Sequence, residues 1–273
     1  MENGLSPEKD VLSLEGITRE LGGYSGFFDI ELRKSVTSTN TLLKELAEGA
    51  EATAPWKVMI AEEQTAGRGR MGRSFESPEG TGIYLSILMK PHIPAEKAVR
   101  ITTAAAVAAC RAIEECTAET PSIKWVNDVY VRGKKVCGIL TEGSADPATG
   151  LLNWAVMGIG FNVYKPQNGF SDAIKDVAGP VILNTQKNLR NRLSGAFLKA
   201  FKALADSSES QNAAAEYKKR SFLLGKSINV LRSGSSKPAE VLDIDDECRL
   251  VVRYADGAVE ALSSGEVSVR QTP

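Results

Sequence analysis

Residues 62–90 read EEQTAGRGRMGRSFESPEGTGIYLSILMK, and the segment at 67–73, GRGRMGR, combines glycine and arginine without an acidic residue. Guanidinium groups this close repel one another unless an anion lies among them, and glycine lets a backbone approach a ligand closely. Apolar, strand-like runs lie on either side, at 58–61 and 83–89. We interpret the loop as a mobile basic clamp for a phosphate or carboxylate. The alternatives are a solvated turn and an RNA-binding arginine–glycine segment, although such segments usually lie in low-complexity tails.

The composition is that of a globular protein, and it limits the classes of function. Of 273 residues, 42% are hydrophobic and 25% are charged, which suits one large domain with a smaller one. The formal net charge of −1 means that nucleic-acid binding would need a local basic patch. The chain has one histidine, His92, and four cysteines without CxxC spacing. We therefore expect free thiols, no histidine-based triad and no metal site built from protein side chains.

Neither a membrane span nor a secretion signal is visible in the sequence. No stretch has the length and apolarity of a membrane-spanning helix, and the opening residues, MENG, start nothing like a signal peptide. We expect a cytoplasmic protein that does not contact membranes.

Hydrophobic periodicity predicts a mixture of strands and helices up to about residue 221. A helix is expected between the capping residues at 37–40 and Gly49, because leucines recur there on one face. An Asn-Asp pair is expected to interrupt the strand at 123–131 with a turn or a polar bend, and the turn at 132–134 is expected to start a hairpin. The other expected strands are 31–36, 58–61, 83–89, 135–142 and 152–162, and the other expected helices are 95–116, 188–205 and 212–220.

The pattern of hydrophobic and polar residues changes from Phe222 onward. Short β-like runs follow one another there, with Gly, Asp and Ser in the turns between them, which is typical of a small SH3-like β-barrel. We expect two domains, at 1–221 and 222–273. The β-like runs lie at 227–231, 239–244, 249–254, 258–262 and 267–270.

Four segments share an unusual feature: each places glycine or a hydrogen-bonding side chain at the end of a strand, where a core strand favours neither. Singly they are weak signals. The glycines at 158 and 160 are not followed by the third glycine and the helix of a dinucleotide-binding motif. Taken alone, Lys135 could be a surface residue, and Trp125 could be a core residue. The segments are 38–40, 64–73, 124–138 and 158–162.

Taken in order, the motifs STN, QTxGRGRxGR, KWxND, KxxGIL and GIGxN resemble the catalytic domain of biotin protein ligases, the enzymes that attach biotin to carboxylases. The match covers about residues 31–164, and the small C-terminal β-module agrees with that family's architecture. The resemblance implies an α+β fold in which helices flank a mixed central sheet of the class II synthetase-like type, followed by an SH3-like barrel.

The resemblance also implies roles for individual residues. The loop at 67–73 would close over biotin and its adenylate, with Arg68 covering the carboxylate and α-phosphate, and Lys135 would be the catalytic lysine beside it. Gly138 and Gly158 would leave room for the bicyclic ring. The implied biotin-binding residues are Ser38, Thr39, Gln64, Gly67, Arg68, Tyr84, Ser86, Lys135, Gly138 and Gly158. The implied nucleotide-binding residues are Arg68, Arg70, Arg73, Phe75, Asn127, Lys135 and Asn162.

Two positions depart from the family's frequent pattern. Val126 stands where proline is common, and Phe75 stands where tryptophan is frequent. Neither carries charge, so the departures affect only how the nucleotide would stack.

The implied reaction explains why these residue types are needed. The carboxylate of biotin would attack the α-phosphate of ATP, and Lys135, Arg68 and Mg²⁺ would reduce the repulsion between the two anions. A closed loop would protect the biotinyl-5′-AMP from water until a lysine of the acceptor attacks it. The implied acceptor is a biotin carboxyl carrier protein or the carrier domain of a biotin-dependent carboxylase. No covalent enzyme intermediate is required, in keeping with the lack of a histidine-paired nucleophile.

Several alternatives remain open. Residues 1–30 are too few for a winged helix, which needs roughly twice that length, so we expect a ligase without a DNA-binding repressor role and without a nucleic-acid partner. A lipoate–protein ligase-like acyl-adenylating enzyme shares the fold but lacks the GRGRxGR loop. Nucleic-acid binding through the loop and an inert adaptor are further alternatives. The sequence leaves open a homodimer, the acceptor carboxylase, the kinetic order of substrates and the role of the C-terminal module.

Overall fold

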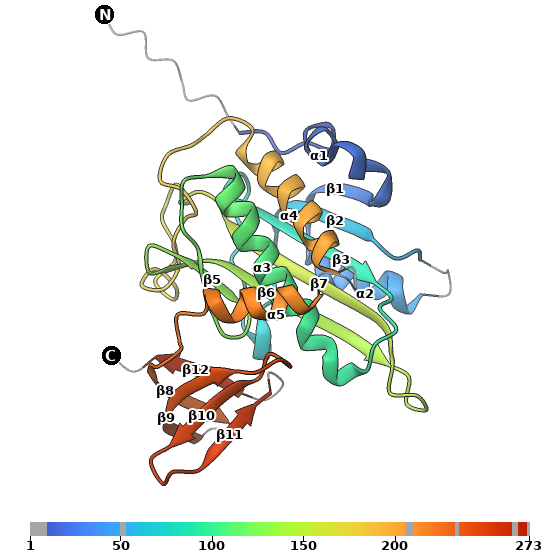
Figure 1. Cartoon of the computed structure of the whole chain (residues 1–273). Helices are drawn as coiled ribbons and strands as arrows, with labels where there is room; N and C mark the ends of the chain where they lie inside the picture. Colours follow the sequence, from blue (N-terminus) through green and yellow to red (C-terminus); the bar gives the residue numbers. More distant parts are fainter. Residues whose placement is uncertain (1–9, 50–52, 206–209, 233–234, 264–266, 272–273) are drawn as a thin grey trace, which may run out of the picture.

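The structure, a computed structural model, describes residues 10–49, 53–205, 210–232, 235–263 and 267–271 (Figure 1). Within them, a seven-stranded sheet of order β1-β2-β3-β7-β6-β5-β4 forms the centre of the molecule. β1 and β2 pair in parallel, and the other neighbouring strands of this sheet pair antiparallel. The strands are β1 (Asp29–Val36), β2 (Lys57–Gln64), β3 (Gly82–Met89), β4 (Ser122–Lys124), β5 (Asp128–Val131), β6 (Lys134–Ala145) and β7 (Leu152–Asn162).

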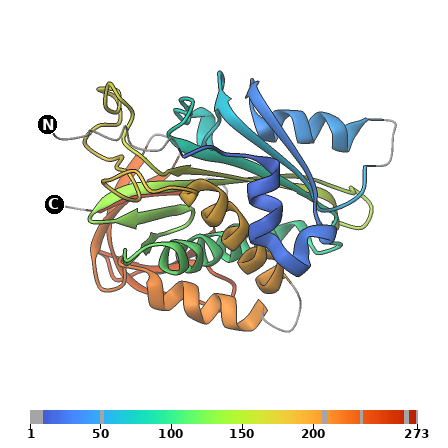
Figure 2. The ribbon, with the colours of Figure 1, turned by 90° about the horizontal axis from the view of Figure 1, so that it is seen from above.

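Helices cover both faces of this sheet, which confirms the predicted class (Figure 2). α3 and α4 pack together against one face, with α1 on α4 and α5 on α3, and α2 lies on the opposite face over β2, β3 and β7. Short 3₁₀ segments precede β1 and α3 and lie in the loop after β2. The helices are α1 (Leu14–Leu21), η1 (Gly22–Phe27), α2 (Thr39–Glu48), η2 (Arg70–Gly72), η3 (Ala95–Ala98), α3 (Val99–Cys116), α4 (Leu189–Ala205) and α5 (Ser210–Arg220).

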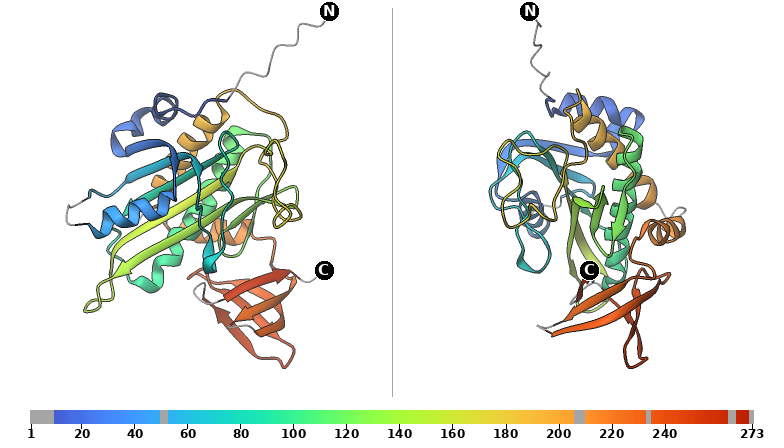
Figure 3. Two further views of the ribbon diagram at one scale, coloured as in Figure 1. Left: turned by 180° about the vertical axis from the view of Figure 1, so that it is seen from behind. Right: turned by 90° about the vertical axis from the view of Figure 1, so that its left-hand side faces the viewer.

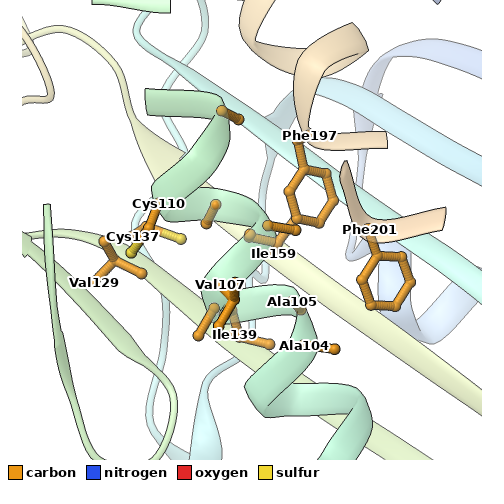
Figure 4. Close-up of a cluster of buried hydrophobic side chains, with 14 of the residues drawn as sticks. Ala104, Ala105, Val107, Cys110, Val129, Cys137, Ile139, Ile159, Phe197 and Phe201 are labelled. Carbon is orange, nitrogen blue, oxygen red and sulfur yellow. The ribbon is translucent and has the colours of Figure 1, made fainter. Parts of the chain in front are cut away.

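Small side chains on α3 allow it to pack closely between the sheet and α4. Alanine is the commonest residue on its buried side, and the rings of Phe197 and Phe201 on α4 stack 5.8 Å apart beside it. Figure 4 shows side chains of α3, the sheet and α4 meeting in one buried cluster. Members of this cluster include Ala104, Ala105, Val107, Cys110, Val129, Cys137, Ile139, Ile159, Phe197 and Phe201.

Two local predictions need correction. The strand expected at 123–131 is two antiparallel strands, β4 and β5, because the chain reverses completely at 125–127. The reversal is fastened to β6, since Asn127 Nδ2 donates to Ile139 O at 2.8 Å and Ile139 N donates to Asn127 O at 3.0 Å. In addition, α1 lies before residue 28, where no helix was expected, and Ser13 caps it by accepting from Gly16 N at 3.0 Å.

The C-terminal residues form a second sheet, which agrees with the predicted small SH3-like module. It is antiparallel, with the order β11-β10-β9-β8-β12, and it lies beside one end of the central part (Figures 1 and 3). The indole Nε1 of Trp125 donates to Cys248 O at 3.0 Å, so this module contacts the β4–β5 turn directly. The boundary at 221/222 stays a prediction. The strands are β8 (Ser227–Arg232), β9 (Ser235–Ile244), β10 (Leu250–Tyr254), β11 (Val259–Leu262) and β12 (Val267–Gln271).

Among the residues that the structure describes, no helix has the length and apolarity needed to cross a membrane.

Candidate active site

A cavity of about 690 Å³ lies on the face of the sheet that carries α2. Its walls come from the start of α2, the loop between β2 and β3, the β4–β5 turn, strands β6 and β7, and the segment 173–178. The fold thus brings together motifs that are far apart in the sequence. The predicted site residues that line the cavity are Ser38, Thr39, Gln64, Arg68, Arg70, Arg73, Phe75, Asn127, Lys135, Gly138, Gly158 and Asn162.

The sheet is hollowed at this point because glycines occupy the cavity side of β6 and β7. Every second residue of a strand faces the same side. Gly138 lies opposite Gly160 across the two strands, and Leu140 lies opposite Gly158. Side chains from other elements can therefore lie directly against the backbone of the sheet.

Two protein side chains take up the space above these glycines. A Cβ at Gly158 would overlap Asn40 Oδ1, and a Cβ at Gly160 would overlap the ring of Phe75. A Cβ at Gly138 would lie 3.2 Å from the same ring. Asn40 packs against Gly158 and Phe75 against Gly138, while both glycines still line the cavity. Their predicted role, to leave room for a ligand ring, stays a prediction.

Hydroxyl and amide groups at the floor of the cavity form a continuous hydrogen-bond network. Gln64 Oε1 accepts from Thr39 N at 2.9 Å and from Thr39 Oγ1 at 3.1 Å, and Gln64 Nε2 donates to Ser77 Oγ at 2.8 Å. The hydroxyls of Thr39 and Ser86 lie 2.7 Å apart, and Ser86 Oγ donates to Asn40 Oδ1 at 2.6 Å. Because each group holds the next, the floor presents donors and acceptors in fixed orientations.

Three predicted site residues lie outside the lining of this cavity. Ser86 is fully buried beneath the floor. Tyr84 is also buried, and its hydroxyl donates to Pro78 O at 2.9 Å. The carbonyl oxygen of Gly67 accepts from Phe75 N at 2.9 Å. A Cβ added at Gly67 would collide with the carbonyl oxygen of Phe75. These three residues support lining residues, and their predicted contacts with biotin stay predictions.

The basic loop lies over the cavity, and other strands supply its anionic and polar partners. Arg68 Nη1 lies 2.8 Å from Glu142 Oε2 on β6. Arg70 Nη1 donates to Asn127 Oδ1 at 3.2 Å, and burial lowers the pKa of Arg70 although Asp128 opposes the shift. Within the loop itself, residues 67–73 include no acidic residue. The fold brings Glu142 and Asp128 to it from elsewhere, and these carboxylates reduce the expected repulsion.

Lys135 is placed at the cavity by both its side chain and its backbone. Its Nζ lies 2.6 Å from Asp128 Oδ1, and both side chains are largely buried. Its N–H donates to Val177 O at 2.8 Å, and its carbonyl oxygen accepts from Gly179 N at 3.0 Å. The ion pair and the backbone contacts place the ammonium group in the same cavity as Arg68.

Sequence reasoning assigned no role to several residues that the fold brings to the site. Asn40 and Asp128 belong to quoted motifs, and Glu142 follows Gly138 and Leu140 at the two-residue spacing of a strand face, so this period could have identified it. The segment 173–178 carries no periodic signal, and only the three-dimensional structure places it at the cavity.

Comparison with protein families gives two matches that together cover most of both sheets. Residues 32–162 match the model described as Biotin/lipoate A/B protein ligase family, and residues 223–270 match the model described as Biotin protein ligase C terminal domain.

Individual proteins are similar over different lengths. A protein named Biotin--[acetyl-CoA-carboxylase] ligase from Mycobacterium tuberculosis is 31% identical over 271 residues, covering 96% of each chain. The Bifunctional ligase/repressor BirA of Bacillus subtilis is 41% identical over 144 residues, which is 52% of this chain and 43% of that protein, so the chain matches less than half of that relative. The solved structure of biotin protein ligase from Aquifex aeolicus in complex with biotin and ATP superposes with a TM-score of 0.72 at 25% identity, covering 89% of this chain and 99% of the other.

Proposed function

The chain belongs to the biotin protein ligase family, and from this membership and the cavity described above we propose that it is an ATP-dependent biotin protein ligase. It activates biotin to biotinyl-5′-AMP and then transfers the biotinyl group to the ε-amino group of a lysine on a carrier protein. The observation that carries this proposal is the grouping of Lys135, Arg68 and Arg70 around one cavity whose floor is a fixed network of hydroxyl and amide groups.

Two groups of lining residues suit the two substrates. The floor around Thr39 and Gln64 offers the donors and acceptors that a ureido ring requires, and the cations Arg68 and Lys135 suit the carboxylate of biotin. Arg70, Arg73, Phe75, Asn127 and Asn162 line the part assigned to the nucleotide. The solved Aquifex structure contains biotin and ATP, which supports both assignments.

In the first step, a carboxylate oxygen of biotin forms a bond to the α-phosphorus of ATP, and the bond from that phosphorus to the β-phosphate bridge breaks, releasing pyrophosphate. The ammonium of Lys135 and the guanidinium of Arg68 stabilise negative charge that builds on the phosphoryl and carboxylate oxygens. In the second step, the amine of the carrier lysine attacks the acyl carbon. AMP leaves, a proton is lost, and an amide bond remains.

Mg²⁺ would enter this site with the nucleotide and would be held mainly by its phosphates, with Asp128 as the nearby carboxylate. Asp128 Oδ1 is paired with Lys135 and Asn127 Oδ1 accepts from Arg70, so these side chains do not form a separate metal site. When bound, the ion would supply positive charge that neutralises the phosphates.

The acceptor is a biotin carboxyl carrier protein or a carrier domain of a biotin-dependent carboxylase. The Mycobacterium relative is named for acetyl-CoA carboxylase, which supports this class of acceptor. The cytoplasmic location, a homodimer, and the expectation that the chain binds neither nucleic acid nor membranes all stay predictions.

Lipoate activation is the second candidate, because the matching family model covers both biotin and lipoate ligases. The 96% coverage of a relative named as a biotin ligase favours biotin. Titration calorimetry with biotin and with lipoate distinguishes the two, since the proposal requires binding of biotin and much weaker binding of lipoate.

Exchange of radioactive pyrophosphate into ATP tests the first step directly. We expect exchange that requires biotin and is not supported by lipoate. Exchange without biotin, or with lipoate alone, would rule out the proposed substrate.

A further inference from the structure

Glu142 lies at the point where β6 leaves the cavity, and it faces three partners from two other segments. Its Oε1 lies 3.0 Å from Lys44 Nζ, and its Oε2 lies 2.8 Å from Arg68 Nη1. Asn40 Nδ2 also donates to Oε2, at 3.2 Å. One carboxylate therefore joins α2, which starts at the cavity floor, to the basic loop that lies over it.

The position of Glu142 follows from the strand that carries it. Every second residue of β6 faces the same side of the sheet. Gly138 and Leu140 line the cavity from this side, and Glu142 is the next residue in the series. Leu140 is the last residue of β6 that lines the cavity, so the Glu142 carboxylate lies just beyond the cavity wall, within reach of Arg68. The register fixes this placement, since Glu142 is opposite Val156 on β7.

The surroundings of Glu142 favour its charged form. The side chain is 18% exposed. Burial raises the pKa of this carboxyl, but hydrogen bonds from Asn40 and Lys44 and the charges of Arg68 and Lys44 outweigh it, so the pKa lies below its ordinary value. A carboxylate at this depth needs nearby cations, because an unpaired buried charge is strongly unfavourable.

We propose that Glu142 is a positioning residue that holds the guanidinium of Arg68 over the cavity. The inference rests on the proposed function, in which Arg68 covers the carboxylate of biotin and the α-phosphate. The contact with Glu142 uses one of the five N–H donors of the guanidinium, so the others can bind a ligand anion. Holding the side chain in place before the ligand arrives lowers the entropy that is lost on binding.

Lys44 and Asn40 let the loop move without leaving Glu142 unpaired. If Arg68 swings away, the carboxylate keeps a cation and a hydrogen-bond donor from α2. The same Asn40 accepts from Ser86 at the floor, so floor and loop belong to one network. Ligand binding at the floor can therefore influence how firmly Arg68 is held.

The substitution Glu142→Gln tests this role, because it removes the charge and keeps nearly the same shape. Glu216→Gln is the matched control: Glu216 is a carboxylate of similar exposure, 22%, that pairs with Arg111 and Arg220 on the far side of the sheet. Both variants are compared with wild type by trypsin cleavage after Arg68 without ligand, by the KM for biotin in pyrophosphate exchange, and by thermal unfolding.

We expect Glu142→Gln to speed cleavage after Arg68 several-fold and to raise the KM for biotin about tenfold, the effect of losing one charged hydrogen bond. The kcat should change less than threefold. In an Arg68→Gly background, Glu142→Gln should have no further effect on KM, because its partner is already absent. Glu216→Gln should change neither cleavage nor KM, whatever it does to unfolding.

Equal cleavage rates for wild type and Glu142→Gln, or equal KM effects of Glu142→Gln and Glu216→Gln, would overturn the positioning role. If Glu142→Gln does not fold, Glu142→Asp carries the same prediction, because it keeps the charge and shortens the reach toward Arg68. Wild-type protein without biotin-dependent exchange would refute the proposed function instead, and the cleavage experiment, which needs no substrate, would still test the contact with Arg68.

Discussion

Lys135 Nζ lies 2.6 Å from Asp128 Oδ1, so the ammonium group that faces the cavity is held by a carboxylate from the neighbouring strand β5. The pairing forms because the hairpin of β5 and β6 brings the two residues to the same side. Asp128 also follows Asn127, which contacts Arg70 of the basic loop. Lys135 and Arg70 are thus oriented by two adjacent residues, Asp128 and Asn127, whereas Arg68 pairs with Glu142 on β6.

Replacing Lys135 by alanine should reduce biotin-dependent pyrophosphate exchange on the order of a hundredfold or more, because one electrostatic contact to the transition state is lost. The fold should persist, since the side chain contributes charge more than packing. Lys134→Ala is the control: it removes the adjacent lysine, whose Nζ donates to Asp176 O on the surface. Exchange in Lys135→Ala within about threefold of wild type would contradict the assignment.

Arg190 should be the most sensitive charged residue for stability among those discussed. The residue is only 2% exposed. Its Nη1 lies 2.6 Å from Glu62 Oε2, and its Nη2 donates to the backbone carbonyl oxygen of Asp10. Arg190→Met should lower the free energy of unfolding by about 3–5 kcal/mol, because the carboxylates of Glu62 and Asp10 would lose their buried cation. Urea unfolding measures this, with the more peripheral Arg192→Met as the control. A loss below about 1 kcal/mol would show that the ion network contributes little net stability.

The parts of the fold that sequence reasoning found are those with a periodic or local signal. The strand ending in Gly158 and Gly160 and the alanine-rich helix at 95–116 follow from patterns that act over a few residues. For the reversal after Trp125 the sequence left a turn or a polar bend open, because both fit an Asn-Asp pair and only pairing with β6 decides between them. Asn40 over Gly158 could not be predicted, since the contact joins distant segments and depends on how α2 docks on the sheet.

The effect of Glu142→Gln on stability should depend on pH in a defined direction. The pKa of Glu142 is lower in the folded protein than its ordinary value, so the charged carboxylate stabilises the fold above the unfolded pKa of about 4.3. This contribution is lost as the pH falls through the lower, folded-state pKa. Urea unfolding of wild type and Glu142→Gln should therefore differ more at pH 7 than at pH 3.5. A difference that is constant or grows in acid would contradict the ionic role.

Replacing Arg68 by glycine should release biotinyl-5′-AMP rather than abolish its synthesis. Lys135 remains at the cavity to support the first step, whereas the guanidinium over the cavity is gone. Released adenylate acylates exposed lysines on unrelated proteins, so biotin should appear on an added bystander such as serum albumin, as detected by streptavidin blotting. Labelling confined to the carrier, at the wild-type rate, would refute the covering role of Arg68.

The loop at 65–76 should change its order when ligands bind. Three glycines give it high conformational entropy, and the contacts Arg68–Glu142 and Arg70–Asn127 fasten it at separate points over the cavity. Ordering a loop of this length costs several kcal/mol at about 1 kcal/mol per residue, so part of the binding energy is used for closure. Closure on biotin before ATP enters would also give ordered kinetics, with biotin first.

Limited trypsin digestion tests this, because Arg68, Arg70 and Arg73 are cleavage sites within the loop. Cleavage there should be readily measurable without ligands, where the Arg68–Glu142 contact slows it only in part, and it should be strongly slowed by saturating biotin plus ATP. Arg253, half-exposed on β10 in the C-terminal sheet, provides an internal reference whose cleavage should not respond. Equal cleavage of the loop in both states would mean that it is preformed, and the site would then have to protect its adenylate without a closing loop.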